Sequence, residues 1–368
     1  MLRKTLTVGL AIAVLTIAAP AGAQFMAADL LYVSGVADTE GVGDSRWVTN
    51  LAITNVEEEV EIDVAIVYLP TGLISNGSQF IDRSTWLGGR EDDGFGLINP
   101  ALADIPPGGT VMLPNPLGQY WPNEGETVNF GALVIFAYEA NTLEDDGTRV
   151  YANAIVNSRV STSRTFYEPD SENEGEFVEV TGSYGQTLPG VPWYNLADPS
   201  AIDDEEDLTF LILGGAIEGE VFRYNVGVLN ASDPLTSITL VLQPFQGNGE
   251  PYLDDNEIPV VRTLSMPPLS HIQYNNVMST LFGIEETPPD STIRISFVNW
   301  SSGSSVPVVG MTVYGTLIDN RTNDPTAILP SFAYPYNIEC QWPSSDGTKS
   351  QATGLRRVSQ RPLAIPSR

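Results

Sequence analysis

The stretch that decides the fold is RWVTNLAITN at Arg46–Asn55, because it returns as VFRYNVGVLN at residues 221–230. In both copies large apolar residues alternate with small or polar ones, and the closing Asn55 falls on Asn230. Such alternation places successive side chains on opposite faces of a β-strand. The pair therefore predicts two equivalent, half-buried strands.

The segments that follow each copy repeat in the same order. The matching ranges are 60–72 with 236–249, 106–121 with 267–282, 132–139 with 292–299, and 149–164 with 306–321. The 106–121 type of segment begins with Pro-Pro, and we expect it to end in one or two helical turns at an aromatic residue. The last pair of ranges places Arg164 on Arg321.

Short alternating strands separated by turns rich in Gly, Pro, Asn and Asp are typical of antiparallel β-sandwiches. We therefore predict an all-β chain with little helix, made of two tandem Ig-like β-sandwich domains at residues 25–170 and 207–332. Residues 171–206 are acidic at both ends and aromatic in the middle, and are predicted to be a linker that packs against one or both domains. Residues 333–368 form a basic tail, predicted to be disordered, with docking on the acidic body or on an anionic partner as the alternative.

Residues 1–23 have the features of a signal peptide. Arg3 and Lys4 precede a short apolar run, and Ala21-Gly22-Ala23 supplies small residues at a cleavage site. We predict cleavage after Ala23 and a secreted, periplasmic or cell-surface location; a retained membrane anchor is the alternative. No later segment has the length and hydropathy of a membrane span.

The composition restricts the partners. The chain has 17 Lys+Arg and 46 Asp+Glu, and removing Arg3 and Lys4 with the signal peptide changes the formal net charge from −29 to −31. Nucleic acid and anionic membranes are therefore poor partners. The single cysteine, Cys340, excludes an internal disulfide and is either a free thiol or an intermolecular link.

Four motifs recur in a recognisable order: W-x-T-N-L-x-I-x-N at residues 47–55, a Pro-rich approach to a short helix, YGQ-x-x-P at 184–189, and LIDNRTNDPT at 317–326. This order resembles uncharacterised secreted proteins from environmental bacteria made of two tandem β-sandwich repeats. The resemblance covers most of residues 25–330. It implies the fold and export, and it brings no activity with it.

Residues for nucleophilic or metal chemistry are scarce. The only histidine, His271, aligns with Thr110 of the first copy, and we expect it at the surface or at a strand edge. A general base needs a positioned partner and a nearby nucleophile, and no G-x-S-x-G elbow is present. One His and one Cys also exclude the usual zinc sites. We predict no catalytic residue and no organic cofactor.

Two kinds of ligand contact remain as hypotheses. Carboxylates bind hard cations such as Ca²⁺, and Asp319 and Asp324 are the candidates, with a strand-ending Asx turn as the simpler interpretation. Trp86 and Trp300 lie in polar segments, and we expect exposed indoles there that stack on sugar rings.

Three functions are compatible with these features. The leading hypothesis is an exported, non-catalytic protein for binding, adhesion or surface structure, with a polysaccharide or another surface protein as partner. The alternative is a carboxylate-based extracellular hydrolase of the glycosidase type, which needs two acids facing each other across a cleft. The third is a subunit of a cell-surface assembly.

Overall fold

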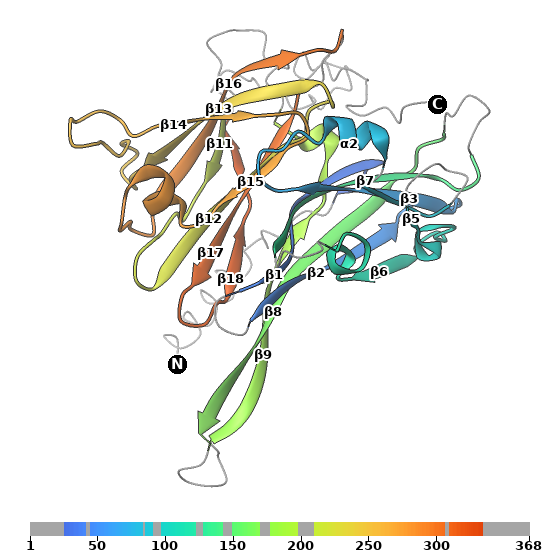
Figure 1. Ribbon diagram of the computed structural model, residues 1–368, viewed down its shortest axis with the longest axis horizontal. Coiled ribbons are helices and arrows are strands. Elements are labelled where there is room, and N and C mark those ends of the chain that lie inside the picture. The colour runs from blue at the N-terminus through green and yellow to red at the C-terminus, as the bar shows by residue number, and fades with distance from the viewer. Residues whose placement is uncertain are drawn as a thin grey trace, which may run out of the picture.

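The computed structural model describes residues 26–41, 45–83, 85–90, 97–122, 128–142, 149–169, 177–197, 210–305 and 309–333. Strands dominate these residues and form three sheets, which are antiparallel except for one short parallel pair (Figure 1). The prediction of an all-β chain is confirmed. The predicted signal peptide at 1–23 and all but the first residue of the predicted tail lie outside the described residues.

The first half of the chain forms one ten-stranded sheet. Its main path is β5 (Leu97–Ile98), β4 (Trp86–Gly88), β3 (Ile62–Pro70), β7 (Val128–Glu139), β1 (Leu30–Glu40), β2 (Arg46–Asn55), β8 (Ala154–Pro169) and β9 (Phe177–Pro189), with β6 (Thr110–Pro114) beside β2 and β10 (Val191–Pro192) beside β1. The register of β1 against β7 shifts between Val33 and Val36, and the end of β1 pairs with β2. The sheet encloses an apolar core to which strands near both of its ends contribute, including Leu87 from β4 and Val156 from β8.

The second half forms two sheets. One contains β15 (His271–Tyr274), β12 (Phe222–Asn230), β17 (Met311–Asp319) and β18 (Pro325–Ile328); the other contains β14 (Arg262–Met266), β13 (Thr236–Phe245), β16 (Thr292–Ser302), β11 (Phe210–Leu213) and β19 (Ser331–Ala333). Val226 and Val313 of the first sheet share one buried cluster with Leu240 and Ile295 of the second. The two sheets therefore pack face to face.

The two halves match in register as well as in strand order. In the first half, β2 lies between β6 and β8, and in the second half β12 lies between β15 and β17. The pair Thr54–Thr110 corresponds to Leu229–His271, the residues that the sequence alignment superposes. In the same way β10 pairs with β1 as β19 pairs with β11. The repeat read from the sequence is therefore also a repeat of backbone pairing.

A buried asparagine explains one repeated residue. The Asn55 side-chain amide donates to the carbonyls of Val60 and Ile105, each at 2.9 Å, and its oxygen accepts from the next turn. Asn230 makes the equivalent bonds in the second half, to the carbonyls of Thr236, Met266 and Pro267. Each Asn thus closes the turn after its strand and ties it to the segment before the Pro-Pro pair. An apolar residue there leaves buried carbonyls unpaired.

Short helices follow the two Pro-Pro segments, as predicted. They are α3 (Pro116–Tyr120), which ends beside Trp121, and η4 (Met278–Phe282), a single π-helical turn. Asn115 and Asn276, which the repeat superposes, both have left-handed backbones with φ of 44° and 51°. Asparagine tolerates this conformation better than most residues. The other short helices are α2 (Gly77–Asp82), η1 (Pro100–Leu102) and η2 (Trp193–Asn195).

The structure describes part of the predicted linker at 171–206, and most of that part belongs to the first sheet. It forms β9, which pairs with β8 from Asn157↔Pro189 to Pro169↔Phe177, and then β10 and η2. The Trp193 indole N–H donates to Asp29 at 3.1 Å, and the Tyr194 hydroxyl donates to the Ala27 carbonyl at 2.6 Å. The aromatic centre of this segment is therefore packed against the first half.

The contact between the two halves is called the junction below. The face of β1, β3 and β7 that points away from their own core packs against Leu229, Ala231 and Leu269 of the second half. Phe80 of α2 and Trp86 of β4 fill the same cluster. Both faces of the central strands of the first half are therefore buried.

The junction depends on the long loop after Pro70, which the second half lacks. The backbone N–H groups of Gly72 and Leu73 donate to the His271 carbonyl at 3.0 and 3.3 Å, and the Asn76 amide donates to the Leu269 carbonyl at 2.7 Å. Hydrogen bonds to backbone carbonyls of the second half therefore hold this loop in place.

Among the described residues, no helix has both the length and the apolar character needed to cross a membrane.

Candidate functional site

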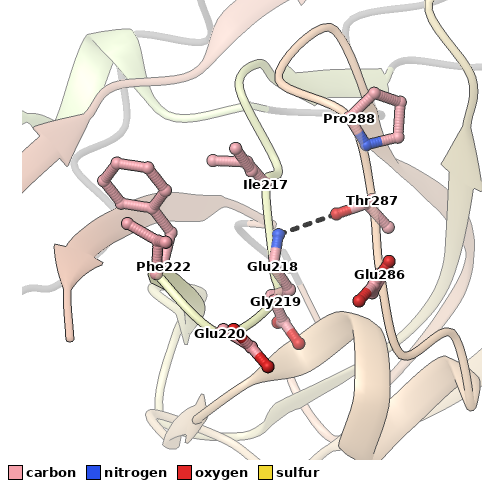
Figure 2. A pocket seen from close by; sticks show the side chains of 9 residues that line it. Ile217, Glu218, Gly219, Glu220, Phe222, Glu286, Thr287 and Pro288 are labelled. Carbon is pink, nitrogen blue, oxygen red and sulfur yellow. Dashed lines mark hydrogen bonds between the residues drawn. The ribbon is translucent and has the colours of Figure 1, made fainter.

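Loops at one end of the second half surround a hollow of about 580 Å³ (Figure 2). Its lining residues are Ile217, Glu218, Gly219, Glu220, Val221, Phe222, Glu286, Thr287 and Pro288. Figure 2 shows Glu220 and Glu286 on two different loops, above the helical turn at the base. The hollow therefore combines carboxylates with an apolar wall.

Glu218 is the buried acid of this hollow, and it serves as a cap. One oxygen accepts from the Met278 N–H at 2.8 Å, and the other accepts from the N–H and hydroxyl of Ser279, both at 3.0 Å. Burial raises the pKa of the Glu218 carboxyl, and the bonds from Met278 and Ser279 oppose that change. Its own N–H donates to the Thr287 hydroxyl at 2.8 Å, which joins the two loops (Figure 2). Both oxygens of Glu218 are thus committed to holding η4.

The LIDNRTNDPT turn borders the hollow. The Asn320 N–H donates to the Val221 carbonyl at 2.8 Å, and its side chain donates to the Glu220 carbonyl at 3.2 Å. The turn connects β17 to β18, and it positions the rim of the hollow through backbone carbonyls.

Within this turn Asp319 is paired with Arg321. The guanidinium donates to both carboxylate oxygens, at 3.2 and 2.9 Å, and the Arg321 N–H donates at 2.8 Å. These bonds lower the pKa of Asp319 to about 2. Asn323 adopts a left-handed φ of 59°, and its N–H donates to the Asp319 carbonyl at 2.7 Å. Asp324 is exposed and contributes its carbonyl to the Asp319 N–H.

This geometry matches the Asx turn better than a cation site. A cation at Asp319 has to compete with a guanidinium that already neutralises the carboxylate. Within the described part of the chain, no three His, Cys, Asp or Glu side chains are grouped to hold a metal ion. The side chain of Arg164, the repeat partner of Arg321, lies outside what the structure describes.

The prediction of an exposed indole is wrong for Trp86. Trp86 is 1% exposed, its ring stacks on Phe136 at 5.4 Å with 9° between planes, and Phe80 lies 4.9 Å away. The loop that carries Trp86 folds back and pairs as β4 with β3 instead of extending into solvent. Trp86 is therefore a packing residue of the junction.

Trp300 is exposed, as its Ser-rich surroundings predict. Its side chain is 42% exposed, and Phe297 contacts it edge-on at 6.4 Å. Leu235, beside Gly303, and Val298, the extra residue where β16 bulges against β13, are also more than half exposed. The structure keeps Trp300 and Trp86 in different environments, so they do not form one platform.

The prediction of a surface position is wrong for His271. It begins the edge strand β15, but its side chain is fully buried at the junction. Burial lowers its pKa to about 3. The matching Thr110 in the first half is exposed, so only the contact with the other half distinguishes the two positions. No local sequence signal reports such a contact.

The other buried acids of the described residues also have donors. Asp63 accepts from Arg90 at 2.7 Å and from the Asp104 N–H at 2.8 Å, and Asp38 accepts from Arg46 at 2.8 Å. Asp233 accepts from the N–H of Leu235 and from the hydroxyl of Thr236, and Asp29 accepts from Trp193. Each of these carboxylates, like Glu218, thus holds a turn, a strand end or an arginine.

Comparison with known proteins adds no assignment. No family model, no curated protein and no solved structure matches the chain. The resemblance to secreted tandem-repeat proteins therefore stays a prediction.

Proposed function

We propose that the chain is an exported, non-catalytic protein for binding, adhesion or surface structure. The observation that carries the proposal is the commitment of its buried acid–base groups to structural contacts. Glu218 caps η4, and His271 is enclosed in the junction. Catalysis by general acid or base requires a group within reach of substrate protons.

The proposed scaffold is a pair of tandem Ig-like β-sandwiches. The shared register of the two halves, including the paired roles of Asn55 and Asn230, supports this assignment. Sandwiches of this class present loops at their ends for recognition. An apolar junction joined by backbone hydrogen bonds favours a fixed orientation of the two units over a hinge.

The proposed ligand class is an extracellular polysaccharide, with Trp300 as the contact. A half-exposed indole offers an apolar face to the C–H groups of a sugar ring. Phe297 supports one edge of the indole and limits its movement. The acidic surface makes a neutral or cationic glycan a better ligand than a sulfated one.

The test is affinity electrophoresis of the mature protein against neutral, cationic and anionic polysaccharides. We expect retardation on at least one neutral or cationic glycan, and its loss in Trp300→Ala. Leu253→Ala is the matched control, because Leu253 is 52% exposed on a different loop. Absence of retardation on every glycan contradicts the ligand class, whereas turnover of a glycan or ester contradicts the non-catalytic assignment.

A second candidate function, subunit of a surface assembly, is favoured by β8 and β9. The pairing of β2 with β8 stops at Arg46↔Ser163, but β8 and β9 remain paired as far as Pro169↔Phe177. Figure 1 shows this two-stranded ribbon projecting away from the sheets. Backbone edges of this kind accept strands from partners. Light scattering after size exclusion tests it: a strict monomer at high concentration argues against self-assembly.

A further inference from the structure

His271 is a buried titratable group that the proposed function does not use. The centre of its ring lies 5.5 Å from the ring centre of Phe130 in the first half. It lies 6.3 Å from the ring centre of Tyr314 in the second half, with 8° between the planes of these two rings. Its carbonyl accepts the two N–H groups of the long loop described above. The only histidine of the chain therefore lies where the two halves are held together.

The imidazole is buried without a well-formed hydrogen bond. Neither ring nitrogen has a partner of normal geometry among the described residues, and the backbone of Ser34 is the one polar group that opposes the effect of burial. A buried polar group without a partner is destabilising. The sandwich itself does not require histidine, because the matching Thr110 is exposed and bonds only to Thr54 across the strand pair. The histidine is thus a feature of the junction and not of the repeat.

The surroundings contain no charge that favours an imidazolium. β17 contributes the phenol of Tyr314, which donates to Gln273 at 2.7 Å. β7 contributes the ring of Phe130. The β1 bulge contributes the backbone of Ser34, which opposes the larger effect of burial on the His271 pKa. No charged side chain of the described chain contributes to the lowering of that pKa to about 3.

We propose that His271 makes the junction an acid-sensitive latch, closed while the imidazole is neutral and released when it takes a proton from solvent. The closed form binds this proton poorly, whereas an opened form exposes an ordinary histidine with a pKa near 6.5. As the pH falls below about 6.5, each further unit therefore shifts the open-to-closed ratio by about tenfold in favour of opening, until the pH nears the closed-state pKa. This property goes beyond the proposed function and holds for any ligand.

The experiment follows the untagged mature chain from pH 7.5 to 3.5. Tryptophan fluorescence includes the signals of Trp86 and Trp193 at the junction among those of the six tryptophans. Small-angle scattering reports on the radius of gyration, and far-ultraviolet circular dichroism reports on the strands. We expect fluorescence and scattering to change at a higher pH than the dichroism does. In His271→Leu the two transitions should merge, with the fluorescence midpoint lowered by about one pH unit or more.

Thr110→His is the matched control, since it places a histidine at the same register position on an exposed strand. It should leave the wild-type midpoint unchanged. An unchanged midpoint in His271→Leu, or a wild-type junction that stays closed down to pH 3.5, overturns the proposal.

A second measurement does not depend on any variant. Because the chain has one histidine, its imidazole C–H proton resonances can be assigned without mutagenesis. They should not titrate between pH 8 and 6.5 in the closed protein, and below that range the open form should appear as a separate set of signals or as exchange broadening. A smooth titration near pH 6.5 with the junction still closed refutes the latch.

Discussion

The two halves of this molecule share a strand order and register but differ in how their sheets close. In the first half β1 passes the irregularity at Val33–Val36 and reaches β2, so one sheet continues around the core. In the second half the equivalent strand β11 ends at Leu213, and Gly215 follows with a φ of 66°. A left-handed backbone interrupts a strand, so two separate sheets result. The length of one strand therefore decides whether this repeated topology forms a continuous sheet.

The halves also differ in what they contribute to the junction. The first half supplies the loop after Pro70, α2 and β4, whereas the second half supplies Leu229, Ala231 and Leu269. The repeated strands form the sheets, whereas the unrepeated loop joins the two halves.

The largest effect is expected for Phe80→Ala, which removes a buried ring from the junction. Truncating a buried Phe lowers the free energy of unfolding by about 4 kcal/mol. Ile74→Ala is the control on the same loop, because Ile74 is 50% exposed. Urea denaturation followed by dichroism gives both values. Equal stability of the two variants would contradict a packing role for Phe80 in the junction.

The next effect compares the repeated asparagines directly. Asn55→Leu and Asn230→Leu each leave buried carbonyls unpaired, and we expect each to lower the unfolding free energy by about 3 kcal/mol. The control variant is Asn299→Ala, because Asn299 is exposed. Thermal and urea unfolding should show similar losses for the two Leu variants. A loss confined to one half would break the equivalence of the repeats.

A smaller effect is expected for Gly77→Ala at the start of α2. A Cβ at this position lies 2.2 Å from the Pro234 carbonyl oxygen, so the loop has to move away from the second half. Forced shifts of this kind destabilise by about 2 kcal/mol. Gly303→Ala is the control, because its nearest contact is 3.8 Å away. Amide exchange at the junction should accelerate in Gly77→Ala alone.

The smallest effect concerns the turn at Asp319. Arg321→Gln removes the guanidinium, so the pKa of Asp319 should rise from about 2 toward its ordinary value. A lowered carboxyl pKa stabilises the fold above the ordinary pKa, and that contribution disappears as the pH falls toward 2. Because the pair is exposed, the change in stability at pH 7 should be barely measurable. Carboxyl carbon NMR follows the titration; an unchanged Asp319 pKa contradicts the pairing.

Much of the fold could be predicted from the sequence because repetition multiplies a weak signal. Alternation in one segment predicts a strand, and the return of the same segments in the same order predicts equivalent neighbours for Asn55 and Asn230. The Pro-Pro segments predicted the short helices in the same way. The exposure of Trp300 followed from its polar surroundings.

The candidate site was less accessible to sequence analysis. Trp86 and His271 become buried because another half of the chain covers them, and the nearby residues carry no sign of that cover. The role of Glu218 also depends on a segment about sixty residues away, because its carboxylate accepts hydrogen bonds from backbone N–H groups there. Such distant contacts have no sequence period, so alternation and spacing do not reveal them.

The long loop after Pro70 has a consequence for how this protein can be divided. It belongs to the first half but makes its contacts on the second, so a cut between the halves exposes the aromatic rings of Phe80 and Trp86 on one fragment. The other fragment loses the cover over three aliphatic side chains and over His271. The halves are therefore related by repetition without being interchangeable: a duplicated or reordered chain would lack a correct neighbour for that loop.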